Sequence, residues 1–288
     1  MDLSKLAPLG LLLASCVGDP SAHLERAREF TFQRQPAEAL LQYEEVLSLL
    51  AKKDPQKVRP LLAPALKGAG DLCFLELKLY PRAIEYYRSL ANHYPDAEET
   101  LEARSALSDL YRSLGDRRAA VAELTALVQS FPKGPDVDRY QFQAVKDYFE
   151  LADYDQVLVE ARALQQRYPG STYAVEAQML VAEALALQGQ RQRAIDAYDE
   201  LVRRWPDDEL APQALMEQAK VYSEMGQDER AVEVLVVALK THPNPKGVQA
   251  EIQRLRKRLA TRRVPEKFDH AEAWPEFHGL VPSEREAN

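Results

Sequence analysis

The side chains able to perform catalysis are spread along the chain without the spacing of an active site. Five histidines stand in no metal-ligand spacing with a cysteine or with one another: His23, His93, His242, His270 and His278. The sequence contains neither a glycine-rich phosphate loop nor a Gly-x-Ser-x-Gly elbow. Adjacent carboxylates such as Asp207 and Asp208 are abundant, which is typical of solvated helix faces. We therefore predict that the protein is not an enzyme and has no catalytic residues, metal or cofactor.

The thiol of Cys16 is the clearest candidate for covalent chemistry. An apolar run over residues 6–15 precedes it, too short for a membrane-spanning helix of about 20 residues. The sequence Leu13-Ala14-Ser15-Cys16 resembles the lipobox of bacterial lipoproteins, in which the cysteine is lipidated and becomes the first mature residue. The resemblance implies a signal peptide over residues 1–15, a lipid anchor at Cys16 with acyl chains such as palmitate, and a short linker over residues 16–19.

Neighbouring residues bear on where such an anchor would reside. Asp2 offsets Lys5, which departs from the positively charged start of a typical signal peptide. Val17 rather than Asp follows Cys16, and by resemblance to Gram-negative lipoproteins this favours the outer membrane, facing the periplasm. The alternative interpretation of the apolar run is a short first helix that caps the fold, with Cys16 as a buried thiol.

Two rows of residues recur every 37 positions along the chain. The first row is a proline that follows an aromatic residue or histidine: Pro95, Pro132, Pro169, Pro206 and Pro243. The second row is a small residue 12 positions earlier: Ala83, Ala120, Val157, Ala194 and Ala231. A fixed period of about 20–50 residues marks an array of stacked structural repeats. Proline cannot continue a helix, so the first row predicts where one helix of each repeat stops.

The pattern around these rows resembles the tetratricopeptide repeat (TPR) of bacterial cell-envelope proteins. The second helix of each expected pair carries a small residue followed by large ones: Ala83/Tyr87/Leu90, Ala120/Leu124/Leu127, Val157/Ala161/Leu164, Ala194/Tyr198/Leu201 and Ala231/Leu235/Ala238. An earlier unit fits at Ala39/Tyr43/Val46, but 44 residues before the next, so an insertion lies between them. Turn glycines occur at Gly115, Gly189 and Gly226, and Ala152 takes that place in one unit. The resemblance implies an all-α, right-handed solenoid of about six helix-turn-helix repeats with a C-terminal capping helix.

Composition agrees with a helical array that binds proteins. Apolar residues make up 46% of the chain, charged residues 28%, and there are only 11 glycines. The net charge of −8 disfavours nucleic acid as a partner. We expect the array and its cap over residues 20–262 and a flexible tail over residues 263–288. The tail contains aromatic side chains that could fold back on the array or bind a partner: Phe268, Trp274 and Phe277.

The resemblance also implies a partner-binding groove lined by the first helix of each pair. Carrying the family's groove positions onto this sequence gives acidic and basic residues around an apolar strip: Asp109, Arg112, Arg139, Phe142, Lys146, Phe149, Met179, Glu183, Met216 and Lys220. Such a strip suits an amphipathic helix or an extended peptide.

Three functional hypotheses follow from these patterns. The leading one is a lipid-anchored scaffold of the outer membrane that recruits other envelope proteins for an assembly or motility machine. The second is a regulator of a peptidoglycan enzyme, or a glycan binder, in which Trp274 contributes to binding. The third is a cytoplasmic TPR adaptor without lipid.

Overall fold

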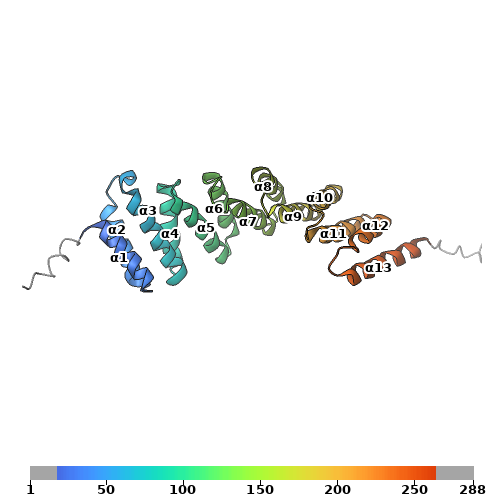
Figure 1. Cartoon of the computed structure of the whole chain (residues 1–288), viewed down its shortest axis with the longest axis horizontal. Helices are drawn as coiled ribbons and strands as arrows, with labels where there is room; N and C mark the ends of the chain where they lie inside the picture. Colours follow the sequence, from blue (N-terminus) through green and yellow to red (C-terminus); the bar gives the residue numbers. More distant parts are fainter. Residues whose placement is uncertain (1–17, 264–288) are drawn as a thin grey trace, which may run out of the picture. The chain divides into compact units, whose positions relative to one another are not determined.

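The computed structural model describes residues 18–263, and all of its regular elements there are helices (Figure 1). It divides into two compact units, residues 1–188 and 189–288, and each is considered by itself. Cys16, the expected signal peptide and the aromatic residues of the tail lie outside the described residues. Within the described part, no helix is both long and apolar enough to cross a membrane.

The first unit contains nine α-helices and a short π-helix among its described residues. Their bounds are α1 Pro20–Phe32, α2 Pro36–Leu50, α3 Pro55–Asp71, the π-helix η2 Leu72–Glu76, α4 Tyr80–His93, α5 Glu98–Ser113, α6 Arg117–Ser130, α7 Val137–Glu150, α8 Tyr154–Arg167 and α9 Ala174–Leu187. Each helix from α1 to α8 packs on the helix that follows it. The chain therefore builds this unit as a row of antiparallel neighbours, as the repeat pattern predicts.

The second unit contains four helices among its described residues: α10 Arg191–Arg204, α11 Leu210–Glu224, α12 Asp228–Ala238 and α13 Pro245–Arg263. Helix α11 packs on α10 and α12, and α13 packs on α12. The contact of α13 is made by Val248, Ile252 and Leu255, which are buried, while exposed Lys246 and Lys257 belong to the same helix. This amphipathic arrangement confirms the predicted capping helix, because one face covers the core and the charged residues meet solvent.

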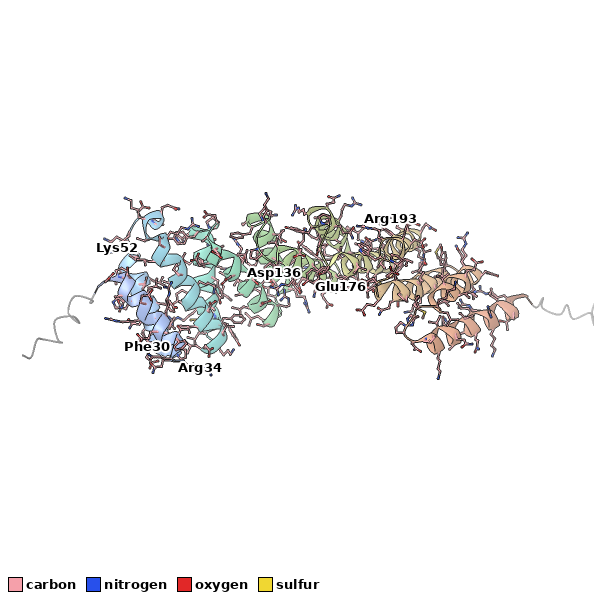
Figure 2. The ribbon with its side chains drawn as sticks, in the orientation of Figure 1. Phe30, Arg34, Lys52, Asp136, Glu176 and Arg193 are labelled. Carbon is pink, nitrogen blue, oxygen red and sulfur yellow. The ribbon has the colours of Figure 1, made fainter. Side chains whose placement is uncertain are left out.

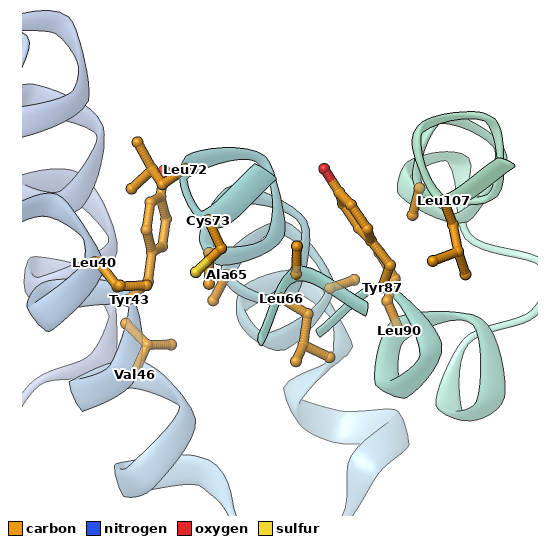
Figure 3. Close-up of a cluster of buried hydrophobic side chains, with 14 of the residues drawn as sticks. Leu40, Tyr43, Val46, Ala65, Leu66, Leu72, Cys73, Tyr87, Leu90 and Leu107 are labelled. Carbon is orange, nitrogen blue, oxygen red and sulfur yellow. The ribbon is translucent and has the colours of Figure 1, made fainter. Parts of the chain in front are cut away.

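The row of small residues lies at the centre of the packing. Each member is 0% exposed: Ala83, Ala120, Val157, Ala194 and Ala231. A larger side chain there would hold the second helix of the pair away from its neighbour. Figure 3 shows part of the buried cluster of the first unit, where the rings of Tyr43 and Tyr87 lie beside α3 and its π-helical end. In the units of Ala83 and Ala194, the small residue and the ring one turn later, Tyr87 or Tyr198, are both buried.

The aromatic residues before the prolines end the second helices. Tyr94, Phe131, Tyr168 and Trp205 are the C-cap residues of α4, α6, α8 and α10. Each donates its backbone N–H to the carbonyl four residues earlier, at distances of 2.9 Å. Their ψ angles lie between 56° and 67°, outside the helical region, so the following proline meets a chain that has already left the helix. Helix α12 departs from this rule and ends at Ala238, before His242.

The turn inside every pair contains one residue with positive φ. Glycine takes this position at Gly115, Gly189 and Gly226, with φ of 82°, 73° and 75°. In the other three turns the residues are Arg34, Lys78 and Ala152, with φ of 58°, 57° and 55°. A left-handed backbone is strained for a residue with a Cβ, so these three turns are locally less favourable than the glycine turns.

The 44-residue step arises inside a helix rather than in a loop. Helix α3 spans Pro55–Asp71 and continues as η2, Leu72–Glu76, before the turn to α4. The added residues lengthen the first helix of the second pair, and Pro60 and Pro64 lie within it. Proline in a helix removes a backbone hydrogen bond and bends the axis. The remaining extra residues of the 37-residue period lie between pairs, in the longer connections 94–97, 131–136, 168–173, 205–209 and 239–244.

The buried small contact in α10 gives the first testable prediction. Replacing Ala194 with Leu is expected to destabilise the protein by about 1–3 kcal/mol, because the added atoms have no space at a fully buried site. Denaturant unfolding followed by circular dichroism measures the change. The control is Ala122→Leu on the exposed surface of α6, which should leave stability nearly unchanged. Equal unfolding midpoints for the two variants would contradict the assigned contact.

The alanine turn gives the second prediction. Ala152→Gly is expected to raise stability by up to about 1 kcal/mol, since glycine relieves the left-handed strain. The reciprocal change, Gly189→Ala, places a Cβ on a backbone with φ of 73° and should lower stability by a similar amount. Thermal unfolding measures both. If the two substitutions shift the melting temperature in the same direction, turn strain is not the cause.

Candidate functional site

The charged surface of α5 contains the first two predicted groove residues. A nitrogen of Arg112 lies 2.7 Å from a carboxylate oxygen of Asp109, one helical turn away. The Asp109 side chain is 62% exposed and the Arg112 side chain 24% exposed. The structure therefore brings this pair together at the surface, with Asp109 accessible to a partner.

Arg112 also binds a carboxylate on the next helix pair, at Asp147 of α7. Its Nε and Nη2 atoms lie 3.2 and 2.9 Å from the two oxygens of Asp147, and Nη1 of Arg117 lies 3.3 Å from one of them. Asp147 is 0% exposed. A buried carboxylate is tolerated only with strong compensation, and two guanidinium groups supply it here.

The charge of Arg112 is fixed by these contacts. Burial by itself lowers the pKa of Arg112, but its hydrogen bonds to Asp147 and Asp109 outweigh that effect and raise the pKa above the ordinary value. Arg112 thus joins α5 to α7 as a permanent cation, and most of its hydrogen-bonding capacity is used within the protein. The sequence pattern did not identify Asp147, because the equivalent positions one period away are Leu110 and Ala184.

The aromatic part of the predicted groove is packed rather than open. Phe142 is 3% exposed and stacks on Tyr173, with ring centroids 5.2 Å apart. The Lys146 Nζ atom lies 5.0 Å from the centroid of the Phe142 ring. Phe149 is half-buried and meets the ring of Tyr154 edge-on at 5.7 Å. The prediction that Phe142 belongs to an apolar strip open to a partner is therefore wrong. Its ring is buried against Tyr173, the residue that precedes α9.

Cationic side chains remain exposed on α7. Arg139 and Lys146 are exposed, and the Arg139 guanidinium lies 5.0 Å from the centroid of the Tyr140 ring. A carboxylate oxygen of Asp136, which Figure 2 labels, is 3.7 Å from Nη2 of Arg139, a loose ion pair at the start of the helix. These two cations are accessible to a partner on the helix that also carries half-buried Phe149.

The remaining predicted residues lie on α9 and α11. Met179 and Glu183 are half-buried on α9 in the first unit. Met216 belongs to the second unit, where it packs partly buried against the cluster around Leu215 and Ala219. Lys220 is exposed and pairs with Glu217 on its own helix. The ten predicted residues thus form two sets, each of which belongs to its own unit.

Beyond the predicted groove, the described residues include a free cysteine and a pocket. Over residues 18–263 no group of three or more histidine, cysteine, aspartate or glutamate side chains is placed to hold a metal ion. Cys73 is a free, buried cysteine, and burial raises the pKa of its thiol to about 11, so it is almost entirely protonated at neutral pH. A pocket between α1, α2 and α3 also exists, and the sequence patterns gave no sign of it.

Comparisons with known proteins agree with this geometry. A model described as a tetratricopeptide repeat-like domain matches residues 139–256, and a tetratricopeptide repeat model matches residues 72–97. No curated protein matches the chain.

Among solved structures, Naa15/Naa10 bound to HypK-THB aligns with a TM-score of 0.58 and 14% identity, covering 84% of this chain and 34% of that chain. YrrB, described as a TPR protein with an unusual peptide-binding site, aligns with a TM-score of 0.48 and 18% identity, covering 71% and 95%. A tetratricopeptide repeat protein from Parabacteroides merdae ATCC 43184 aligns with a TM-score of 0.45 and 16% identity, covering 86% and 94%.

The identities are too low to transfer a partner, and the first alignment supports the fold alone. Together with the two matching models and the repeated helix pairs, it leads to one conclusion. The described helices have the tetratricopeptide repeat fold, and residues 139–256 and 72–97 match tetratricopeptide repeat models.

Proposed function

We propose that this protein is a lipid-anchored scaffold of the bacterial outer membrane, which recruits other envelope proteins on the periplasmic side. The observation that carries the proposal is the position of Cys16, the last residue of the lipobox-like sequence. Helix α1 begins at Pro20, and the side chain of Asp19 caps it by accepting a hydrogen bond from the Ser21 N–H at 3.0 Å. Only residues 17–19 separate the proposed anchor from the folded repeats.

A short linker has a physical consequence for such a scaffold. Three residues span about 10 Å even when fully extended, so the first helix pair would lie close to the bilayer. Several acyl chains give far more stable attachment than one chain, whose binding is marginal and reversible. The repeats would then present their surfaces within a narrow layer beside the membrane.

The partner-binding surface of the proposal is the exposed part of α5 and α7. Asp109, Arg139 and Lys146 are exposed there, and Phe149 is a half-buried residue of the same α7. Charges at the rim of a binding surface guide association and orientation, while the half-buried ring supplies apolar contact. An amphipathic helix or extended segment of another envelope protein, with carboxylates facing Arg139 and Lys146, fits this chemistry.

The anchor is tested on the mature protein. Mass spectrometry of the N-terminus from envelope membranes is expected to find residues 1–15 removed and Cys16 carrying acyl chains. Cys16→Ser should remain unprocessed and lose that modification. An intact Met1 followed by an unmodified Cys16 in the wild-type protein would exclude the anchored scaffold and favour the adaptor without lipid.

The surface is tested by affinity capture from envelope membranes. Replacing both Arg139 and Lys146 with Glu is expected to reduce partner recovery at least tenfold. The substitutions remove two attractive contacts at the rim of the surface and place negative charges opposite the partner's carboxylates. The matched control is Arg162→Glu, an exposed cation on α8. Circular dichroism checks that all variants fold. Equal recovery by the double variant and the wild type would move the binding site away from α7.

A further inference from the structure

A pocket of about 530 Å³ opens in the first unit, between the turn after α1, the start of α2 and the end of α3. Its deeper wall includes Tyr43 and Leu72, which are 6% and 4% exposed. Its outer part includes Phe32, which is 90% exposed, and Leu75, which is 55% exposed. The pocket thus combines a buried apolar wall with two exposed apolar side chains at its mouth, beside polar residues that include Arg34 and Glu76.

The walls of this pocket are shaped by the most irregular segment of the described chain. A Cβ on Gly68 would come within 2.4 Å of the Tyr43 ring, so only glycine lets that ring lie against α3. The π-helix Leu72–Glu76 carries Leu75 and Glu76 to the pocket, and π-helical turns are frequent at functional sites. In Figure 3 the Tyr43 ring lies beside Leu72 and Cys73, at the end of the lengthened helix. The lengthened helix thus forms one wall of the pocket.

Two opposite charges stand at the same pocket. Arg34 and Glu76 both line it and are exposed, and Figure 2 labels Arg34 in the turn that follows α1. Within residues 18–263, neither side chain has a hydrogen bond or ion pair. Asp71, by contrast, accepts hydrogen bonds from Tyr87 at 2.8 Å and Lys67 at 2.7 Å, so its charge is already compensated. The pocket therefore offers one unpaired cation and one unpaired anion.

We propose that this pocket is the interface of a symmetric dimer and that its occupant is a second copy of the chain. In a twofold-symmetric interface every contact occurs twice, because a residue of one protomer meets a second residue of the partner and the reverse contact also forms. Phe32 of one protomer would enter the pocket of the other, and Arg34 would pair with the partner's Glu76, in both directions. A second copy thus covers both exposed apolar residues and pairs both charges. An unrelated peptide would need to bring its own matching set.

The dimer is independent of the lipid anchor and of the surface on α7. None of its residues belongs to the proposed partner-binding set, and the pocket requires no acyl chain. Loss of either proposal would leave the other intact, because sedimentation reports only self-association and capture reports only recovery of a foreign partner.

Sedimentation equilibrium of the full-length chain over a concentration series tests the apolar contact. The wild type is expected to show a reversible monomer–dimer equilibrium. Phe32→Ser should raise the dissociation constant at least tenfold, about the loss of one central anchor residue. Leu41→Ser is the matched control, since Leu41 is 61% exposed on α2 and does not line the pocket. A monomeric wild type, or equal association of wild type and Phe32→Ser, overturns the proposal.

A charge exchange tests the pairing and its symmetry. Arg34→Glu alone and Glu76→Arg alone should each weaken the dimer, because each places like charges opposite one another twice. An equimolar mixture of the two variants should restore association, and so should the chain carrying both substitutions. Failure of the mixture and of the double variant to associate better than the single variants would overturn the proposed pairing. Unchanged circular dichroism melting curves verify that the exposed substitutions leave the fold intact.

Discussion

The fold depends on how closely the two helices of each pair approach. One position in every second helix from α4 onward carries a side chain no larger than valine, and every member of that row is fully buried. Because a helix pair has no core of its own, its apolar surface is removed from water only against adjacent pairs. The small residue sets the distance between neighbouring helices at which this burial occurs. The buried rings of Tyr87 and Tyr198 fill the space that is left between the helices.

Helix ends are the part of the fold that could be predicted most closely from sequence. A residue before proline is driven out of the helical region, so the aromatic rows mark where α4, α6, α8 and α10 stop. These signals are local and concern the backbone alone. The turn position was predictable at the glycines for the same reason. At Arg34 and Lys78 the turn is imposed by the packing of the helices on either side, which no local preference reveals.

The exposure of the groove residues could not be predicted in the same way. Family positions place Phe142 on the correct helix, but its burial depends on Tyr173, which lies outside α9 in a connection between pairs. Asp147 is another example, because its burial requires two arginines from the preceding pair. The sequence shows the lengthening of α3 only as an irregular 44-residue step. The π-helical end of α3 packs against α2 and α4, which the step does not reveal. Contacts between different repeats thus determine the burial of Phe142, the burial of Asp147 and the conformation at the end of α3.

Residues that interrupt the period therefore distinguish this chain from other helical arrays. The buried small row and the capping aromatics are required in any stack of such pairs, so they carry little information about a partner. Asp147 breaks the apolar row of its position and, by binding Arg112 and Arg117, makes those cations structural. Arg139 and Lys146 are left as the accessible cations among the predicted residues of α7. Elsewhere in the same unit, residues of the lengthened α3 and of η2 form one wall of a pocket. Specific recognition is expected at these interruptions, because there the chemistry of one repeat is not repeated in the next.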